Sequence, residues 1–304
     1  MSDERAPDGP PVSKSPRSEP SGAAGIPGAT GGPGGKPSPR PRFTAPRIIE
    51  MKRRGDPIVV VTAYDFPMAR IADEAGAEIL LVGDSLGTVV LGYESTLPVT
   101  VEDMLHHTRA VTRARPSALV VADMPFMSYQ VSDEQAVLNA GRLVKEGGAD
   151  AVKLEGGERV GPAVRRMVEA GIPVMGHLGL TPQSVLAFGG YKVQARGEAD
   201  QERLLREARL LEQSGCFSLV LEGIPARLGG LVTREIGIPT IGIGAGPQCD
   251  GQVLVSHDLL GLFLGHQPKF VRRYAALGEA MREAFARYAA DVKARRFPSD
   301  AESY

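Results

Sequence analysis

The sequence has 304 residues with 35 basic and 36 acidic side chains, and its formal net charge of −1 argues against a nucleic-acid partner. No stretch reaches the roughly 18 consecutive apolar residues of a membrane-spanning helix, so we expect no membrane partner either. The two cysteines, Cys216 and Cys249, lie far apart without the spacing of a metal site, which fits a reduced, cytoplasmic protein.

The N-terminal segment, residues 1–46, differs in composition from the rest of the chain. It holds 11 of the 24 prolines and 8 of the 37 glycines, but no leucine. Such a segment cannot bury enough apolar surface to offset the entropy lost on ordering, so we predict a disordered tail. It lacks the apolar run of a secretory signal, and its acidic residues argue against a transit peptide. The simplest interpretation is a solvated tail without a specific role, followed by one catalytic domain at residues 47–304.

From Pro57 onward, short apolar runs alternate with longer segments of helical periodicity. The runs are continuously apolar, as expected for parallel strands that are buried on both faces. Eight strands are predicted, at residues 58–63, 78–82, 118–122, 151–154, 173–177, 218–221, 240–243 and 252–255. Eight strand–helix units in a domain of this length favour a closed (β/α)8 TIM barrel, which typically has about 250 residues.

The segments between these runs carry helix-start and helix-stop signals. Thr100 is a suitable N-cap for a helix at 101–114, with Asp103 at its third position. Ser132 opens a second helix that ends before two glycines. That helix is predicted at 132–146, and others at 159–170, 202–213 and 226–235. A charged, alanine-rich helix at 272–295 is expected to pack on the outside of the barrel or on a neighbouring subunit.

Acidic residues follow three successive predicted strands. In a barrel all these strand ends open on one face, where active sites lie, so Asp84, Asp123 and Glu155 should converge. Three ionised carboxylates repel one another unless a cation joins them, and Lys153 helps only if it points inward. All-oxygen ligands suit Mg²⁺, and the sequence has no Cys/His cluster for zinc. The pattern therefore predicts a Mg²⁺ site, against the alternative that each acid is only a turn or helix cap.

The other polar strand ends are less specific. His177 follows the fifth strand and is either part of the site or a hydrogen-bonded wall residue. His106 and His107 lie in a predicted helix and are interpreted as structural. The glycine-rich loop at 242–251 is either a phosphate-cradling turn or a tight wall of the site.

Several collinear segments resemble the ketopantoate hydroxymethyltransferase family. They are VGDSL at 82–86, STLPVTV at 95–101, ADMPF at 122–126, KLEGG at 153–157, GHLGLTPQS at 176–184, FGGYKVQ at 188–194 and IGIGAG at 241–246. The resemblance covers about residues 44–298, and the long N-terminal segment is its one departure from the family core.

The resemblance implies a definite reaction. A hydroxymethyl group passes from methylene-tetrahydrofolate to 3-methyl-2-oxobutanoate and gives 2-dehydropantoate, on the route to pantothenate and coenzyme A. The resemblance also implies Mg²⁺ and a homodecamer of two stacked pentameric rings. The ketone and carboxylate oxygens of the 2-oxo acid can chelate the metal together, which stabilises the enolate that forms when the C3 proton leaves.

The resemblance also implies roles for individual residues. Asp84 and Asp123 bind metal and substrate, Glu155 completes the metal set directly or through water, and Ser85 and Lys153 bind the substrate carboxylate. Glu222, after the sixth strand, is the general base at C3. A carboxylate is a weak base for a carbon acid, so we hypothesise that Glu222 lies in a less polar pocket than the other acids, where it would be a stronger base.

Two alternatives stay open. The first is a lyase of the isocitrate lyase or phosphoenolpyruvate mutase type, which shares the strand-end acids and the enolate chemistry. Those enzymes typically carry a KKCGH-like motif, and this sequence has none. The second is a catalytically inactive barrel that serves as a scaffold through its tail. The complete set of candidate catalytic residues argues against it.

Overall fold

The structure is a computed structural model, and it describes residues 40–304 except residues 264 and 266. Most of the predicted tail lies outside the described residues, but its boundary at residue 46 is wrong. Phe43 is buried, and helix α1 already begins at Ala45 and runs to Arg54. Phe43 and Ala45 belong to the apolar cluster that fills the barrel. Composition alone missed them because two apolar side chains hardly change the average of a proline-rich segment.

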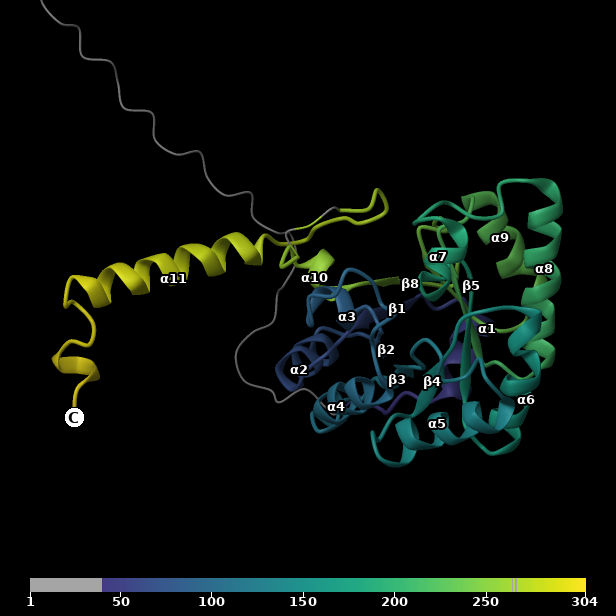
Figure 1. Cartoon of the computed structure of the whole chain (residues 1–304), viewed down its shortest axis with the longest axis horizontal. Coiled ribbons are helices and arrows are strands. Elements are labelled where there is room, and N and C mark those ends of the chain that lie inside the picture. Colours follow the sequence, from purple (N-terminus) through teal and green to yellow (C-terminus); the bar gives the residue numbers. More distant parts are fainter. Residues whose placement is uncertain (1–39, 264, 266) are drawn as a thin grey trace, which may run out of the picture. The chain divides into compact units, whose positions relative to one another are not determined.

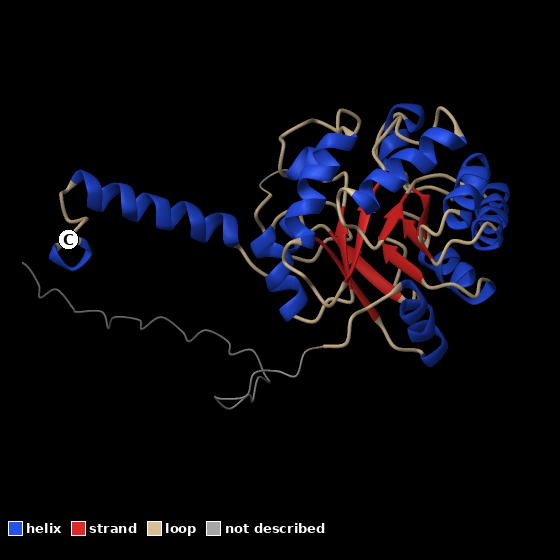
Figure 2. Cartoon of the chain, turned by 90° about the horizontal axis from the view of Figure 1, so that it is seen from below, coloured by secondary structure: helices blue, strands red, loops and turns tan. Residues whose placement is uncertain are grey.

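Eight parallel strands form a closed barrel in the order of the sequence, with β8 paired to β1. The strands are surrounded by helices (Figure 2). They are β1 Ile58–Thr62, β2 Ile79–Val82, β3 Leu119–Asp123, β4 Ala151–Lys153, β5 Val174–Gly179, β6 Ser218–Glu222, β7 Thr240–Ile243 and β8 Gly251–Leu254. The TIM barrel and all eight predicted strands are confirmed.

Strand β3 shows why the strands are continuously apolar. Leu119 and Val121 belong to the cluster inside the barrel, whereas Val120 and Ala122 belong to the cluster between the strands and the helices. Successive side chains point to opposite faces of a strand, so both faces are buried here and no position is left for a polar residue.

Helix α1 precedes the first strand, and the other helices alternate with the strands along the chain or follow β8 (Figure 1). After α1 come α2 Phe66–Glu74, α3 Leu86–Val89, α4 Val101–Thr112, α5 Asp133–Lys145, α6 Gly161–Glu169, α7 Val185–Phe188, α8 Glu198–Gln213, α9 Ala226–Glu235, α10 Ser256–Leu259 and α11 Leu277–Lys293. The predicted capping box is present, because the Thr100 side chain accepts from Asp103 N and the Asp103 side chain accepts from Thr100 N. Helices α1 and α2 and the one-turn helices α3, α7 and α10 were not predicted from the sequence.

The last helix has an unusual environment. None of the residues of α11 is buried, so the contacts that the sequence analysis expected on the outside of the barrel are not formed. In the part of the chain that the structure describes, no helix is long and apolar enough to cross a membrane.

Candidate active site

The alternation of side chains along the strands carries charged groups into the top of the barrel. In β3, Asp123 continues the inward face that Leu119 and Val121 occupy. In β4, Lys153 follows inward-facing Ala151 in the same way. The same spacing of two residues separates Glu155 from Lys153, His177 from inward-facing Met175, and Glu222 from inward-facing Val220. The sequence therefore places these five polar groups on one inner surface, above the apolar filling of the barrel.

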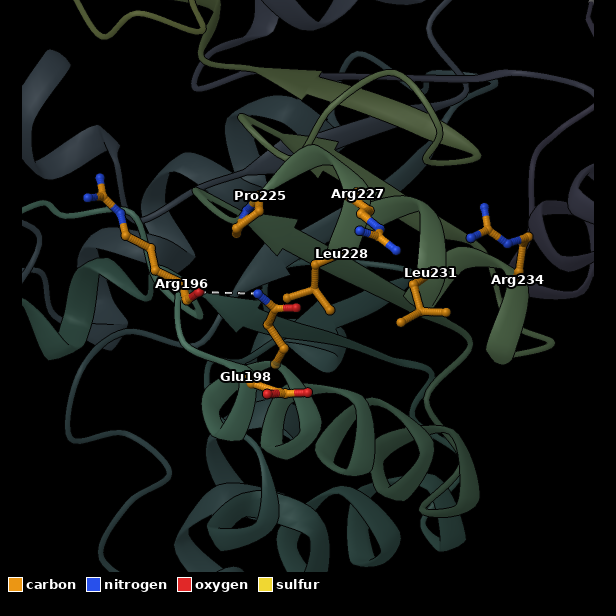
Figure 3. Close-up of a pocket in the computed structure, with 8 residues that line it drawn as sticks. Arg196, Glu198, Pro225, Arg227, Leu228, Leu231 and Arg234 are labelled. Atoms are coloured by element: carbon orange, nitrogen blue, oxygen red, sulfur yellow. Dashed lines mark hydrogen bonds between the residues drawn. The ribbon is translucent and has the colours of Figure 1, made fainter.

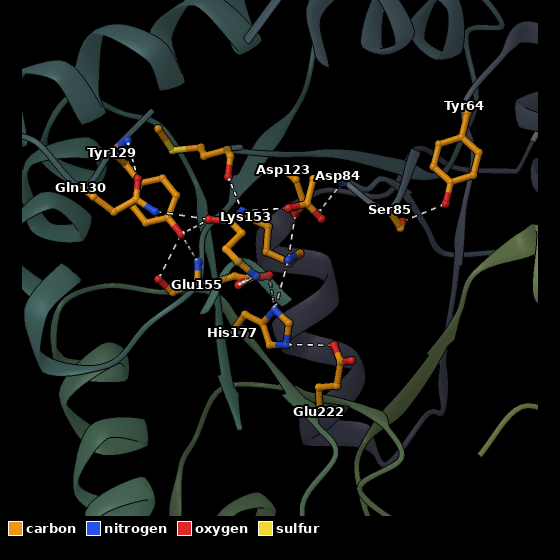
Figure 4. A network of polar contacts seen from close by, with 12 residues as sticks. Tyr64, Asp84, Ser85, Asp123, Tyr129, Gln130, Lys153, Glu155, His177 and Glu222 are labelled. Atoms are coloured by element: carbon orange, nitrogen blue, oxygen red, sulfur yellow. Dashed lines mark hydrogen bonds and ion pairs between the residues drawn. The ribbon is translucent and has the colours of Figure 1, made fainter. Parts of the chain in front are cut away.

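Lys153 lies at the centre of this group (Figure 4). Its Nζ is 2.9 Å from Asp123 Oδ1 and 3.2 Å from His177 Nδ1. The other oxygen of Asp123, Oδ2, accepts a hydrogen bond from Asp84 N at 3.0 Å. Lys153 is 4% exposed and points inward, as its predicted role requires. Burial would lower the pKa of Lys153, but the surrounding carboxylates outweigh burial and raise it, so the side chain stays an ammonium.

Gln183 joins the carboxylates from the other side. Its Nε2 donates to Asp84 Oδ2 at 2.9 Å, and its backbone N–H donates to Glu155 Oε2 at 3.0 Å. Its Oε1 accepts from the Tyr129 hydroxyl at 2.6 Å. Sequence reasoning assigned no role to Gln183 or Tyr129, although Gln183 stands within the quoted GHLGLTPQS motif. A buried amide that contacts two carboxylates positions both of them.

His177 connects the central cluster to Glu222. Its Nδ1 is 3.5 Å from Glu155 Oε1, and its Nε2 is 3.2 Å from Glu222 Oε2. Burial and the Lys153 ammonium lower the pKa of His177, but the two glutamates outweigh them and raise it to about 9. If the ring is a cation, both nitrogens carry protons; if Lys153 donates to Nδ1, the ring is neutral and its proton is on Nε2. In both states Nε2 carries a proton close to Glu222 Oε2, although the two atoms form no well-aligned hydrogen bond, so His177 belongs to the site and is not merely a wall residue.

The hypothesis about the surroundings of Glu222 is wrong. Its side chain is 14% exposed, compared with 3% for Glu155 and 4% for Asp123, and it faces an imidazole. Glu222 is therefore less buried than Glu155 and Asp123, the opposite of the burial that the hypothesis requires. A residue at the end of a strand lies nearer to the open face than the residues below it, and a sequence does not show how far the loops cover it. 

The central carboxylates experience an excess of negative charge. Burial is the largest influence on Asp84 and Asp123, and it raises the pKa of both. The charges of Asp123 and Glu155 add to this effect at Asp84, whereas Lys153 opposes it at Asp123 without cancelling it. Burial also acts on Glu155, but His177 and Lys153 outweigh it and lower the pKa of that carboxyl. Lys153 and His177 thus compensate the charge of Glu155, whose pKa is lowered. They leave the charges of Asp84 and Asp123 undercompensated, and the pKa values of these two carboxyls stay raised.

Ser85 lies beside the cluster without a direct bond to it. Its hydroxyl is 2.9 Å from the Tyr64 hydroxyl, which comes from the end of β1. Gly83 separates Ser85 from Asp123, because a Cβ added at Gly83 would stand 2.7 Å from Ser85 Oγ and 3.6 Å from Asp123 Oδ2. The absence of a side chain at Gly83 therefore allows the hydroxyl and the carboxylate to approach the same space.

The glycine-rich loop after β7 forms a tight wall. Gly244 has φ +63°, and an added Cβ would be 2.8 Å from the Phe270 ring; Gly246 has φ +88°, and its Cβ would be 2.4 Å from Ala226 Cβ. Backbone conformation and close packing both explain these glycines. The structure thus favours the wall over the phosphate-cradling turn.

The donor set fits Mg²⁺, although the described residues contain no group of three or more Asp, Glu, His or Cys side chains arranged to hold a metal ion. Mg²⁺ commonly binds through one or two carboxylates and completes its shell with water and substrate oxygens. Asp84 and Asp123 are adjacent, buried and undercompensated. Asp123 Oδ1 has an ion-pair contact with Lys153 but accepts no well-aligned hydrogen bond. Both oxygens of Glu155 have other neighbours, which suits a more distant role in such a site.

Fold and site together define the class of this protein: a β/α-barrel enzyme with buried carboxylates, a lysine and a histidine at the C-terminal ends of its strands. The model of the family described as ketopantoate hydroxymethyltransferase matches residues 42–300. This chain belongs to the ketopantoate hydroxymethyltransferase family, and the predicted resemblance is confirmed.

Relatives with the name 3-methyl-2-oxobutanoate hydroxymethyltransferase match almost over their whole length. The one from Moorella thermoacetica is 58% identical over 265 residues, which are 87% of this chain and 98% of the relative. The one from Chlorobaculum parvum is 52% identical over 276 residues, which are 90% of this chain and 100% of the relative.

Solved structures with the same fold are much less similar in sequence. A phosphonopyruvate hydrolase has a TM-score of 0.58 at 13% identity and covers 86% of this chain and 93% of its own. A 2,3-dimethylmalate lyase of the PEP mutase/isocitrate lyase superfamily has a TM-score of 0.55 at 18% identity, with coverage of 87% and 89%. These likenesses concern the fold alone and do not favour the lyase alternative.

Proposed function

We propose that this enzyme transfers the one-carbon unit of methylene-tetrahydrofolate to C3 of 3-methyl-2-oxobutanoate as a hydroxymethyl group, with water supplying the hydroxyl oxygen and tetrahydrofolate released, and so produces 2-dehydropantoate for pantothenate and coenzyme A synthesis. The observation that carries the proposal is the buried cluster of Asp84, Asp123, Lys153 and Glu155, which His177 joins to Glu222. The relatives support the proposal because they have the name of this activity and are identical to this chain at more than half of the aligned residues.

In this proposal Glu222 takes the proton from C3 of the 2-oxo acid. Its carboxylate is the most exposed of the four acids, so a substrate entering from the open end of the barrel meets it first. His177 Nε2 lies 3.2 Å from Glu222 Oε2, an ion-pair contact without a well-aligned hydrogen bond, and its proton favours the carboxylate form of Glu222. Once Glu222 is protonated, the His177 contact weakens, and Glu222 can return the proton in a later step.

Asp84 and Asp123 would hold Mg²⁺, and Glu155 would complete the set directly or through water. Bound Mg²⁺ supplies a Lewis acid for the ketone oxygen of the substrate, where negative charge develops. The Ser85 hydroxyl and the Lys153 ammonium bind the substrate carboxylate, and Lys153 also offsets the charge of Asp123 at 2.9 Å. Gln183 holds Asp84 and His177 contacts Lys153 before the substrate arrives. The site therefore needs little reorganisation during the reaction.

We further propose a homo-oligomer, a decamer as the family resemblance implies. Leu277, Met281, Phe285, Tyr288 and Val292 recur at intervals of three or four residues and share one face of α11. They are 39–67% exposed in the single chain. A second copy of the chain would bury this face, which water otherwise covers. The setting we propose is cytoplasmic, with small molecules as the only other partners, and with neither nucleic acid nor membrane.

Proton NMR of 3-methyl-2-oxobutanoate in D₂O tests the function in two stages. Enolisation alone exchanges the C3 proton for deuterium, and adding methylene-tetrahydrofolate yields 2-dehydropantoate. Both signals should disappear with a chelator and in Glu222→Gln, whereas Glu74→Gln, an exposed change on α2, should keep them. Exchange without product would instead favour an enzyme with another electrophile, such as the lyase alternative.

The scaffold alternative has its own test. Because residues 40–46 contribute to the barrel, the deletion must stop before residue 40. An enzyme should keep near-normal turnover without residues 1–39. A scaffold that acts through its tail should show no turnover in either form and should lose its binding partner on truncation.

A further inference from the structure

A groove of about 580 Å³ lies between helices α8 and α9 (Figure 3). Its polar lining consists of Arg196, Glu198, Gln201, Arg227 and Arg234, and its apolar lining includes Leu231. Arg227 and Arg234 of α9 line this space, whereas Arg196 borders it through its backbone carbonyl, which accepts a hydrogen bond from Gln201 Nε2 at 3.2 Å (Figure 3). None of the buried catalytic groups lines the groove, so it is a separate feature of the surface.

The arginines in the groove differ from their neighbours on the same helices. Arg203, Arg206 and Arg209 of α8 each form an ion pair with a carboxylate. The three groove arginines form no ion pair with any of the described residues. Helix α9 also begins at the groove without a side-chain cap and without an acidic residue in its first turn, so its first N–H groups add positive potential, whereas Glu198 opposes it at the start of α8. The α9 side of the groove is thus a positive surface that suits an anion.

The groove adjoins the proposed active site. Pro225 lines it and is three residues after Glu222, which limits the separation of their Cα atoms to about 10 Å. On the other side, Gln194 N donates to Gly223 O at 2.8 Å, and Arg196 follows two residues later. A ligand in the groove can therefore reach the site that contains Glu222.

The spacing of the arginines favours a ligand with more than one anionic group. Arg227 and Arg234 are seven residues apart on α9, which is about 10 Å along a helix. The 2-oxo acid has a single carboxylate, which the proposed mechanism uses inside the barrel. A planar guanidinium matches a carboxylate with two parallel hydrogen bonds. The remaining substrate of the proposed reaction, the folate, carries its carboxylates on a flexible glutamate tail.

We propose that the groove between α8 and α9 binds the carboxylates of the glutamate tail of the folate one-carbon donor. This inference rests on the proposed function and adds a binding site for one of its substrates. The pterin end would then extend past Pro225 towards Glu222, and each additional glutamate would add a carboxylate along α9.

The test uses the full chain with Arg227→Gln and Arg234→Gln combined, and methylene-tetrahydrofolate with one or three glutamates. In the unmodified enzyme the triglutamate should have the lower KM. The double variant should raise the KM for the triglutamate by about 5- to 20-fold, with kcat and the KM for 3-methyl-2-oxobutanoate nearly unchanged. Added salt should raise the folate KM of the unmodified enzyme more than that of the variant. Arg70→Gln, an exposed arginine on α2, is the matched control and should behave as the unmodified enzyme.

Three results would overturn the inference. The first is an unchanged folate KM in the double variant, and the second is an equal rise in the KM values for the folate and for 3-methyl-2-oxobutanoate. The third is a changed oligomeric state, which would make the groove a subunit contact. Failure of the proposed function is a different result, because the unmodified enzyme would then show neither C3 exchange nor product. In that case calorimetric titration with tetrahydrofolate triglutamate still decides the groove. Binding that the double variant weakens supports the site, and absence of binding refutes it.

Discussion

Lys153→Met removes the positive charge at the centre of the candidate active site. The Lys153 ammonium is 4% exposed and lies 2.9 Å from Asp123 Oδ1 and 3.2 Å from His177 Nδ1. Methionine has a similar length and no charge, so the change creates little empty space. It leaves Asp123 and Asp84 buried without their nearest cation. Loss of one partner from a buried ion pair destabilises a protein by about 3–5 kcal/mol, and we expect this range at pH 8.

The loss should depend on pH in a definite direction. Asp84 and Asp123 already have raised pKa values in the folded protein, so they bind protons more tightly there than in the unfolded chain. A group of this kind contributes stability below its unfolded pKa, near 4, and that contribution is lost as the pH rises through the folded pKa. Removing the ammonium raises both folded values further. The variant should therefore approach the unmodified protein at pH 4–5 and fall increasingly below it towards pH 8.

Urea denaturation at several pH values, with chelator present, measures this difference directly. Lys145→Met, an exposed change on α5, should alter the unfolding free energy by no more than about 0.5 kcal/mol. A Lys153→Met loss below about 1 kcal/mol at pH 8, or a loss that is the same at pH 5, would show that Lys153 does not compensate the buried carboxylates.

Four other changes address the rest of the structure. Gln183→Leu leaves Asp84 Oδ2 without its donor and should cost about 2–4 kcal/mol of unfolding free energy, measured in urea. Gly246→Ala combines a left-handed backbone with a clash between the added Cβ and Ala226 Cβ, so it should lose about 2–4 kcal/mol. Gly171→Ala, at φ +85° with no atom within 4 Å, should lose only about 1–2 kcal/mol, and equal losses would refute the packing argument. Phe285→Arg should dissociate the oligomer in light scattering if α11 forms a subunit contact; an unchanged mass would contradict that role.

The barrel could be predicted because its signals are local. A continuously apolar run such as Leu119–Ala122 is explained only by burial of both faces, and repetition of this pattern limits the possible folds. The shared face of the strand ends in a barrel also predicted that Asp84, Asp123 and Glu155 converge before any contact was known. Phe43 and Ala45 were missed because their burial depends on the barrel end that they cover, and the local composition contains no trace of it.

The contacts within the site could not be predicted in the same way. His177 and Gln183 are connected to Glu222 and Asp84 across separations of 45 and 99 residues, and many polar residues in the sequence could have made such contacts. The burial of Glu222 was predicted wrongly for the same reason, since loops from distant parts of the chain decide how much water reaches it.

The sequence by itself determined which residues line the inside of the barrel and which acids stand at its open end, because strand periodicity and strand order are encoded locally. Only the tertiary structure decided how the charges are paired. Lys153 contacts Asp123, Gln183 bridges two carboxylates, and His177 faces Glu222 because barrel closure brings strands from distant parts of the sequence within a few ångströms of one another. The strength of each charge interaction depends on that distance and on the exclusion of water, and both are properties of the folded chain.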